Sequence, residues 1–495
     1  MLRDFESYYA AGATWLAHGD PYSAAIWPRE ALVPGVIATR YELLPYVGPP
    51  MSLPLWALFS RLSFQTAGRL WAGVLVLAAL AAVIATAVLL QRRDRWSIIS
   101  LLLLAIGFGP LTSDLALGQV AIVAFAAVLV TTLFFASKYW WAGVATAIAA
   151  AVQPNLTLSL FATVKNRRTV IVLGAACAMF FACCLQASGG MRGVLHYFSV
   201  LHDHLRAERY AVIQLTPTAM AYGLGLQQNV SSLIGTTVTA GAVLFGFYCV
   251  TSRAYHRTAK LALLCAVLPF VVPFFHEHDL VIVFFPAAAC AVWSGGPLRA
   301  VTAFAVVLVA VDWLGIAQRP DGTLQASLLA LSTICALAIM PLRQAQGDTK
   351  NTEHDTNNTE GDTKKAHDDT NVMLSSSKHR NKFNTALRQA QGDTGNARGD
   401  TDLRMQLLPL LVIPLIVLCG FLAARHPAPI WPDAMRALPS RVHDLSAAQA
   451  WHLELACSGL IQVDAFWALL RSLSLLGCAL LVLICAKVCR ARSNA

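Results

Sequence analysis

Long apolar segments recur along almost the whole chain, and this feature restricts the possible folds more than any other. A helix that crosses a bilayer needs about 20 mostly apolar residues. The chain offers apolar windows near this length at residues 67–91, 96–112, 119–137, 169–187, 230–251, 261–275, 279–293, 300–318, 323–341, 405–424 and 462–486. Because these runs are continuous and do not alternate with polar residues, an outer-membrane β-barrel is excluded. The sequence predicts an all-α polytopic integral membrane protein.

The composition supports this class. Hydrophobic residues make up 57% of the chain and charged residues 13%, against roughly 45–50% and about 25% in ordinary soluble domains. Much of the polar content lies in one internal stretch at 343–404, so the remainder is still more apolar than the average. A single water-soluble globular domain is therefore excluded.

The polar stretch at 342–404 repeats itself. Residues 342–349 read LRQAQGDT, residues 387–394 read the same, and GDT recurs at Gly361 and Gly399. A segment this poor in apolar residues cannot bury enough surface to fold, so we expect disorder. A regulatory loop and a translated repetitive DNA element are both possible interpretations, and the verbatim repeat favours the second. No basic stripe interleaved with aromatic residues is present, so nucleic acid is not an expected partner.

The charges of the connecting loops predict the topology. Basic residues are favoured on the cytoplasmic side of short loops. The loops that we assign to the cytoplasmic face contain Arg92, Arg93, Arg95, Lys138, Lys165, Arg167, Arg168, Arg253, Arg257, Lys260, Arg299, Lys487, Arg490 and Arg492. The opposite, outer face then receives residues 1–66, the loop 188–229, the turn Phe275–Asp279 and the loop 425–461.

One apolar segment breaks the alternation of sides. Both ends of Tyr139–Val164 are expected in the cytoplasm, and Gln153-Pro154-Asn155 interrupts the middle. Proline lacks an amide donor and breaks a helix. Two half-helices that enter the membrane and return satisfy both ends, and we prefer this re-entrant hairpin to one full span with misplaced basic residues. The prediction is about 11 spans plus the hairpin.

Residues 1–66 form the predicted outer-face region, with membrane-surface helices. The region contains acidic residues and no signal peptide, and no span precedes it to carry it outward. We therefore expect that a transmembrane helix normally precedes Met1 and is missing here. The other predicted regions are a transmembrane core at 67–341, the insert at 342–404, and C-terminal spans at 405–495 that include the outer loop 425–461.

The first polar cluster on the outer face is centred on Asp4. If the chain is helical from Asp4 to Leu16, Asp4 and Tyr8 share one face, with Tyr9 adjacent and Gly19 and Pro21 ending the helix. A carboxylate beside tyrosines at a membrane surface suits a general base that acts on a hydroxylated substrate. The alternative is an ordinary helix cap, because acidic residues are favoured at helix starts.

Two further clusters have equally plausible structural interpretations. Asp114 precedes Gln119 in an expected short outer turn, where Asp114 could cap the next span. The loop 188–229 contains groups that could receive a phosphate, or it could form an amphipathic helix at the interface. Its ionisable residues include His196, His202, Asp203, His204, Arg206 and Arg209.

The fourth cluster is His276-Glu277-His278-Asp279, which lies between two apolar runs. Ionisable residues are costly at that depth and are therefore functional candidates. A metal ion is considered and not assigned, because residues two apart point to one side only in extended backbone. The chain also contains no Cys-x-x-Cys pair and no His-Glu-x-x-His motif that would indicate zinc.

The clusters, taken in this order, resemble a known family. The matching pieces are Asp4-Phe5-x-x-Tyr8-Tyr9-x-Ala11, Gly19-x-Pro21-Tyr22, Tyr46-x-x-Pro49-Pro50, Gly118-Gln119, Trp141-Ala142-Gly143 leading to Gln153-Pro154, and His276-x-x-Asp279-Leu280. Together they resemble the bacterial polyprenol-phosphate-mannose-dependent mannosyltransferases of glycosyltransferase family 87, within the GT-C superfamily. The chain departs from the family pattern at Gln153, where relatives commonly have lysine, and in its lack of a span before Asp4.

The resemblance implies a GT-C-like fold with an outer-face cavity in the bacterial inner membrane. By analogy, Asp4 is the base that deprotonates the acceptor as it attacks the sugar with inversion. The expected donor is a polyprenyl-phosphate sugar, the acceptor a lipid or glycan, and no cofactor is expected. Residues expected to bind the donor phosphate or the substrates are His276, His278, Asp279, Tyr8, Tyr9, Arg206 and Gln119.

A polytopic transporter or lipid flippase is the alternative function, because broken helices are typical of transporters. Against it, the chain shows no inverted internal repeat, and its ionisable residues gather at one face and not at mid-membrane.

Overall fold

The computed structural model describes most of the chain outside the polar insert. The described residues are 2–30, 32–33, 44–135, 138–164, 167–295, 297–311, 322–339, 445–457, 459–493 and a few positions between 414 and 425. These residues form helices and no strand, apart from one isolated bridge between Ser23 and Ser446. The prediction of an all-α polytopic membrane protein is confirmed. The insert 342–404 lies outside the described residues.

The helices follow the predicted apolar windows. Within the part of the chain that the structure describes, four helices are long and apolar enough to cross a membrane: α5 (Phe64–Leu89), α10 (Arg167–Ala187), α13 (Gln228–Thr251) and α23 (Ala465–Ser493). The shorter helices of the core are α8 (Ala121–Phe134), α14 (Arg257–Val271), α15 (Phe284–Trp293), α16 (Pro297–Ala310) and α18 (Gly322–Ile339). The total of about 11 spans stays a prediction.

Two of the long helices expose much of their apolar surface. Leu233, Leu244 and Phe247 of α13 and Val170 and Ile171 of α10 are exposed large apolar side chains. A soluble protein rarely leaves such contiguous apolar surface uncovered. These faces therefore fit contact with lipid.

The window at 96–112 is not a straight span. The chain forms α6 (Arg95–Gly107) and α7 (Gly109–Leu117), which meet at an angle of 63°. Pro110 occupies the first turn of α7, where a proline is tolerated and where it prevents α6 from continuing. Because α7 extends to Leu117, the expected turn around Asp114 is wrong: Asp114 is a fully buried residue inside a helix.

The predicted break at Pro154 is present. Helix α9 (Tyr139–Val152) ends before Gln153, and the chain continues as the 3-10 helix η3 (Pro154–Thr163). Helix η3 packs against α8, α9 and α14, so the break is built into the protein core. The orientation of this segment in a bilayer stays a prediction.

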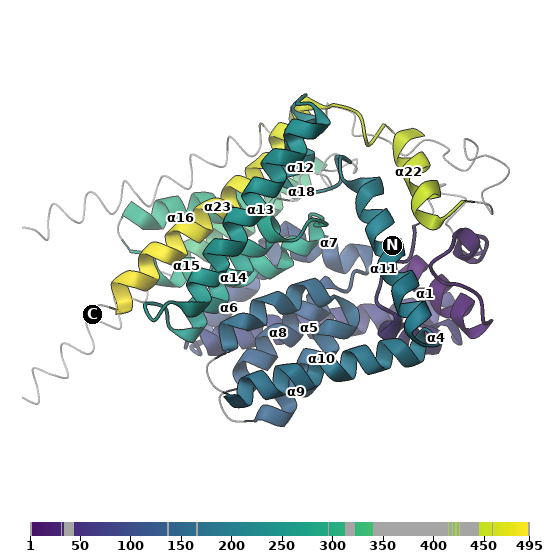
Figure 1. Cartoon of the computed structure of the whole chain (residues 1–495). Helices are drawn as coiled ribbons and strands as arrows, with labels where there is room; N and C mark the ends of the chain where they lie inside the picture. The colour runs from purple at the N-terminus through teal and green to yellow at the C-terminus, as the bar shows by residue number, and fades with distance from the viewer. Residues whose placement is uncertain are drawn as a thin grey trace, which may run out of the picture.

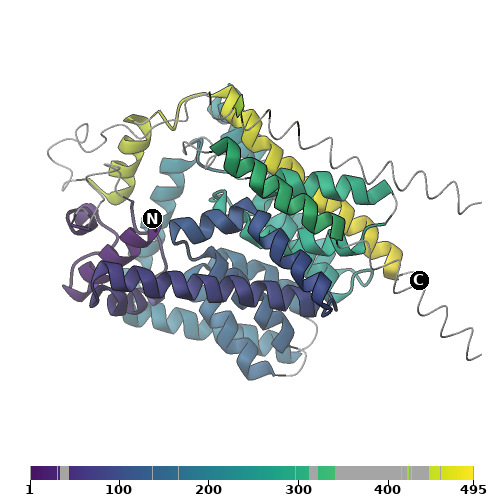
Figure 2. The same cartoon turned by 180° about the vertical axis from the view of Figure 1, so that it is seen from behind.

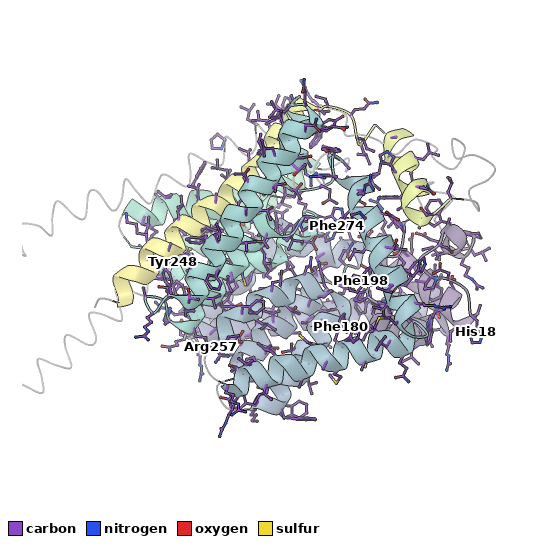
Figure 3. All side chains as sticks on the ribbon, in the orientation of Figure 1. His18, Phe180, Phe198, Tyr248, Arg257 and Phe274 are labelled. Atoms are coloured by element: carbon purple, nitrogen blue, oxygen red, sulfur yellow. The ribbon has the colours of Figure 1, made fainter. Side chains whose placement is uncertain are left out.

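The segments predicted on the outer face gather at one end of the molecule. They include α1 (Arg3–Leu16), α4 (Leu53–Ser60), α11 (Met191–Glu208) and α22 (Ala447–Cys457), at the right in Figure 1 and at the left in Figure 2. Arg257, from a predicted cytoplasmic loop, lies toward the opposite end (Figure 3). The remaining short elements are η1 (Ala24–Ile26), α2 (Trp27–Glu30), η2 (Pro50–Ser52), α12 (Pro217–Gly223) and η4 (His278–Val283).

Helix α1 is held against the core through two glycines. A Cβ atom on Gly12 would lie 2.3 Å from the backbone carbon of Trp56, so α1 and α4 touch backbone to backbone. Gly118 ends α7 with a φ of +80°, which favours glycine, and a Cβ there would lie 3.1 Å from the Cβ of Phe5. Only residues without a side chain allow α1 to approach both neighbours this closely.

We expect Gly12→Ala to displace α1 and to reduce activity without touching any substrate. The added methyl would collide with the backbone of Trp56, which cannot rotate away, and overpacking of this kind typically costs about 1–3 kcal/mol of stability. A shift of about 1 Å in a catalytic group can cost about 100-fold in rate. Thermal unfolding and turnover measure the two effects.

Gly73→Ala in α5 is the matched control, because a Cβ there meets no atom within 4 Å. The control should unfold and turn over like the wild type. A Gly12→Ala protein that behaves like this control would contradict the close α1–α4 contact.

Candidate functional site

A cavity of about 430 Å³ lies among the helices of the predicted outer end. This volume falls within the roughly 300–1,000 Å³ typical of small-molecule sites. Phe274, one of its lining residues, lies well inside the molecule, whereas His18 lies at the edge (Figure 3). Six of the residues predicted from the sequence line the cavity: Asp4, Tyr8, Gln119, His276, His278 and Asp279.

Asp4 and Tyr8 form one wall, together with Gln119. The side-chain amide of Gln119 donates a hydrogen bond to the carboxylate of Asp4, and the hydroxyl of Tyr8 donates to Oε1 of Gln119 at 2.7 Å. Asp4 and Tyr8 share one face of α1, as predicted. Leu2 and not Asp4 is the N-cap residue, but Asp4 lies in the first turn of α1, where an acidic residue is also favoured by the free amides.

The Tyr8 hydroxyl is held in its neutral form. Burial raises the pKa of Tyr8 well above its ordinary value, and the nearby carboxylates of Asp4, Asp114 and Asp279 raise it further. Tyr8 therefore acts as a hydrogen-bond donor to Gln119. The amide of Gln119 is in turn fixed with its N–H groups toward Asp4.

Tyr9 and Arg206 do not line the cavity. The Tyr9 hydroxyl donates to the carbonyl of Leu62 at 2.7 Å, and its ring packs against Phe64. Arg206 is exposed on α11. Neighbouring helical positions point in different directions, so sequence proximity to Tyr8 and His204 was a poor guide for these two residues.

The turn after α14 also lines the cavity. Oδ2 of Asp279 accepts the backbone N–H of His276 at 2.8 Å, and its Oδ1 accepts the amide of Gln153 at 2.6 Å. Leu215 donates to the carbonyl of Phe275 at 2.7 Å and ties the turn to the loop after α11. The helix break at Pro154 thus brings Gln153 to the cavity.

Glu208 is the main site residue that the sequence analysis missed. Its side chain is 2% exposed and lines the cavity. Oε1 lies 3.1 Å from Nε2 of His204, and Oε2 lies 3.1 Å from Nε2 of His276. The side chains of Gln214 and Trp451 also donate to this carboxylate. The signal in the sequence was the spacing of His204 and Glu208, since residues four apart on a helix are neighbours.

Glu208 and His276 shift each other's pKa values toward their charged forms. Burial alone would raise the pKa of Glu208, but His204 and His276 hold it well below its ordinary value. Burial opposes charging of His276, yet hydrogen bonding and attraction to Glu208, with a contribution from Asp279, raise the pKa of His276 above its ordinary value. Both residues are therefore stabilised as a carboxylate and an imidazolium.

The sequence analysis argued against a metal ion because His276 and His278, two residues apart, would point to one side only in extended backbone. The structure contradicts this argument. The centroids of the two rings lie 5.3 Å apart although the backbone between them is not extended, and ligand atoms of His276, His278 and Asp279 all fall within 4.8 Å of one another. This set could hold a metal ion. His276 and Asp279 are, however, already engaged with Glu208 and Gln153. We therefore describe the cluster as a hydrogen-bond network.

A buried ion pair between Arg471 and Glu277 stabilises the turn after α14. Nε of Arg471 in α23 lies 3.7 Å from Oε2 of Glu277, and its Nη2 donates to the carbonyl of Ile213 at 2.8 Å. Removing one partner of a buried pair leaves an uncompensated charge. The C-terminal span thus fixes the wall that carries His276.

The arrangement is suited to transfer of a group from an anionic leaving group to a hydroxyl. A carboxylate of α1 lines the cavity, and so do hydrogen-bond donors of the turn after α14, which include an imidazolium. The first can accept a proton. The second can stabilise developing negative charge.

Comparison with known proteins gives the class of enzyme. Residues 46–273 match the sequence model of glycosyltransferase family 87. No curated protein and no solved structure shows a significant similarity to the chain. The matched region includes Gln119, Gln153 and Glu208, and it favours a glycosyltransferase over the alternative of a transporter or flippase. The match supports assignment of the chain to glycosyltransferase family 87, a GT-C-type family, and with it the class of membrane glycosyltransferase.

Proposed function

We propose that the protein transfers a sugar from a polyprenyl-phosphate donor to a lipid or glycan acceptor, and that this sugar is mannose. The reaction takes place on the outer face of the bacterial inner membrane and inverts the anomeric carbon. The observation that carries this proposal is the cavity, whose lining includes both Asp4 and His276.

In the proposed reaction, Asp4 is the general base. The acceptor oxygen forms a bond to the anomeric carbon while the bond from that carbon to the phosphate oxygen breaks. The acceptor proton passes to the carboxylate of Asp4, and the bonding electron pair leaves with the polyprenyl phosphate. Gln119 holds the carboxylate in place through its amide.

The leaving phosphate gains negative charge as the bond breaks. Preorganised donors and positive charge aimed at such a group stabilise the transition state. His276 supplies an imidazolium, and His278 lines the same wall. No cofactor is required in this scheme, because the lipid phosphate already activates the sugar.

The lipid-linked donor is supported by the position of the cavity among helices with exposed apolar faces. A polyprenyl chain can remain in the bilayer while its sugar phosphate enters the cavity from the side. A nucleotide sugar would need a phosphate-binding loop, and the chain has no Gly-rich motif in a strand-turn-helix context.

The test is transfer by the purified full-length protein in lipid nanodiscs. Synthetic polyprenyl-phosphate mannose and GDP-mannose are supplied separately with a membrane lipid extract as the acceptor. We expect product only with the lipid-linked donor, in the anomeric configuration opposite to that of the donor. Transfer from GDP-mannose alone, or retention of configuration, would refute the proposal.

A further inference from the structure

Glu208 links four separate parts of the chain at one buried point. The carboxylate belongs to α11, and its partners come from α11 itself, the loop after it, the turn after α14, and α22. A buried carboxylate is costly unless it is paired and hydrogen-bonded. Here both oxygens have partners, so the anion is well stabilised.

The hydrogen bonds indicate which imidazole carries the positive charge. Nε2 of His204 contacts Glu208, while its Nδ1 is buried and has no hydrogen-bond partner among the described residues. An unpaired buried N–H is costly, so a proton on Nε2 of His204, where Glu208 accepts it, is favoured. Of the two imidazoles, His276 is the one whose pKa is raised above its ordinary value by Glu208.

Gln214, in the loop after α11, contacts both Glu208 and His276. The backbone N–H of Phe275 donates to Oε1 of Gln214 at 2.9 Å, which turns the amide nitrogen of Gln214 toward Glu208. This nitrogen and Nε2 of His276 both lie within hydrogen-bond distance of Oε2 of Glu208 and 3.0 Å from each other. Because a carboxylate only accepts hydrogen bonds, a proton on Nε2 of the His276 imidazolium points to Glu208.

One donor of His276 is left for a ligand. The side chain is 20% exposed and lines the cavity, and Nδ1 has no hydrogen-bond partner among the residues that the structure describes. When the imidazole is doubly protonated, Nδ1 carries a second N–H group.

We propose that Glu208 is a positioning residue that keeps His276 protonated and oriented, so that the imidazolium holds the phosphate of the lipid donor. This inference rests on the proposed function for the identity of the ligand. Glu208 and Asp279 raise the pKa of His276, and Arg471 from α23 lowers it. The other titratable groups near it are His204 from α11 and Glu277 and His278 from its own turn.

The sign of the pH dependence follows from the charges. With Glu208 present, the raised pKa of His276 keeps the imidazolium to higher pH than for an ordinary histidine. Without the carboxylate, His276 loses its proton at lower pH. The effect of removing Glu208 is therefore largest above neutrality and shrinks at acidic pH, where the histidine is protonated in both proteins.

The experiment measures binding of farnesyl phosphate, a short polyprenyl phosphate, to the full-length protein at pH 6 and pH 8. We expect Glu208→Gln to weaken binding about tenfold at pH 8, in the range of a lost charged hydrogen bond, and less at pH 6. Comparing variant and wild type at the same pH cancels titration of the ligand. Asp203→Asn, an exposed acid on the same helix, is the control and should leave binding unchanged.

Glu208→Asp covers the case in which the glutamine variant does not fold. This variant keeps the buried negative charge, but its side chain is shorter by one methylene, so the carboxylate lies farther from His276. We therefore expect the same pH-dependent loss of binding, smaller in magnitude. A wild type that does not bind farnesyl phosphate would overturn the inference, as would losses equal at both pH values or absent. Pronounced pH dependence without any transfer from a polyprenyl-phosphate sugar would refute the proposed function and leave this inference standing.

Discussion

Replacing Asp4 with asparagine should lower the rate of sugar transfer by about 100-fold or more, which is the usual cost of losing a general base. The amide oxygen of asparagine can still accept the hydrogen bond from Gln119, so α1 should stay in place. The variant loses only the ability to take up the acceptor proton. The measurement is the transfer rate with saturating donor, together with the thermal stability of the purified protein.

Asp20→Asn is the matched control for this substitution. Asp20 lies just after α1, is exposed, and pairs with His196 at 3.0 Å outside the cavity. The same chemical change there should leave the transfer rate close to that of the wild type. Transfer by the Asp4→Asn protein at near wild-type rate would exclude Asp4 as the base.

The sequence predicted those features that depend on local chemistry. Continuous apolar runs predicted the helices, Pro154 predicted the break, and helical periodicity predicted that Asp4 and Tyr8 share a face. Each of these follows from a few neighbouring residues. The structure agrees with them because membrane helices are strongly determined by their own composition.

Features that depend on packing between distant segments were not predicted. The sequence gives no sign that Trp451, in the C-terminal loop, reaches Glu208 of α11. The window at 96–112 looked like one span, since a hydropathy pattern does not reveal the 63° bend at Phe108. Tyr9 and Arg206 were proposed from their neighbours in sequence, and helical geometry directs both away from the cavity.

The region that matches the family model contains some of the site residues and not others. The matched region, 46–273, contains Gln119, Gln153 and Glu208, which hold the two walls of the cavity. Of the residues proposed to act on substrates, Asp4 lies well before this region and His276 just after it. The assignment of these two residues therefore rests on cavity geometry, and kinetic tests of both are the most informative.

The second large effect is expected for His276→Ala. A hydrogen bond to a charged group is worth about 1.5–3 kcal/mol, so loss of the imidazolium should raise the KM for the lipid donor about 10- to 100-fold. The KM for the acceptor should change little. Donor use by the wild type should also fall as pH rises through the raised pKa of His276, and this fall should be absent in the variant.

His278→Ala separates a phosphate contact from a purely structural role of the turn. Nε2 of His278 lies 3.8 Å from Oδ1 of Asp279, and His278 has no contact with Glu208, so its removal should affect donor use less than removal of His276. His276→Ala also leaves Glu208 with one partner fewer, which lowers stability, so rates are compared per folded molecule. Equal increases in the donor and acceptor KM values, or unchanged kinetics with reduced stability alone, would show that His276 supports the fold and does not hold the phosphate.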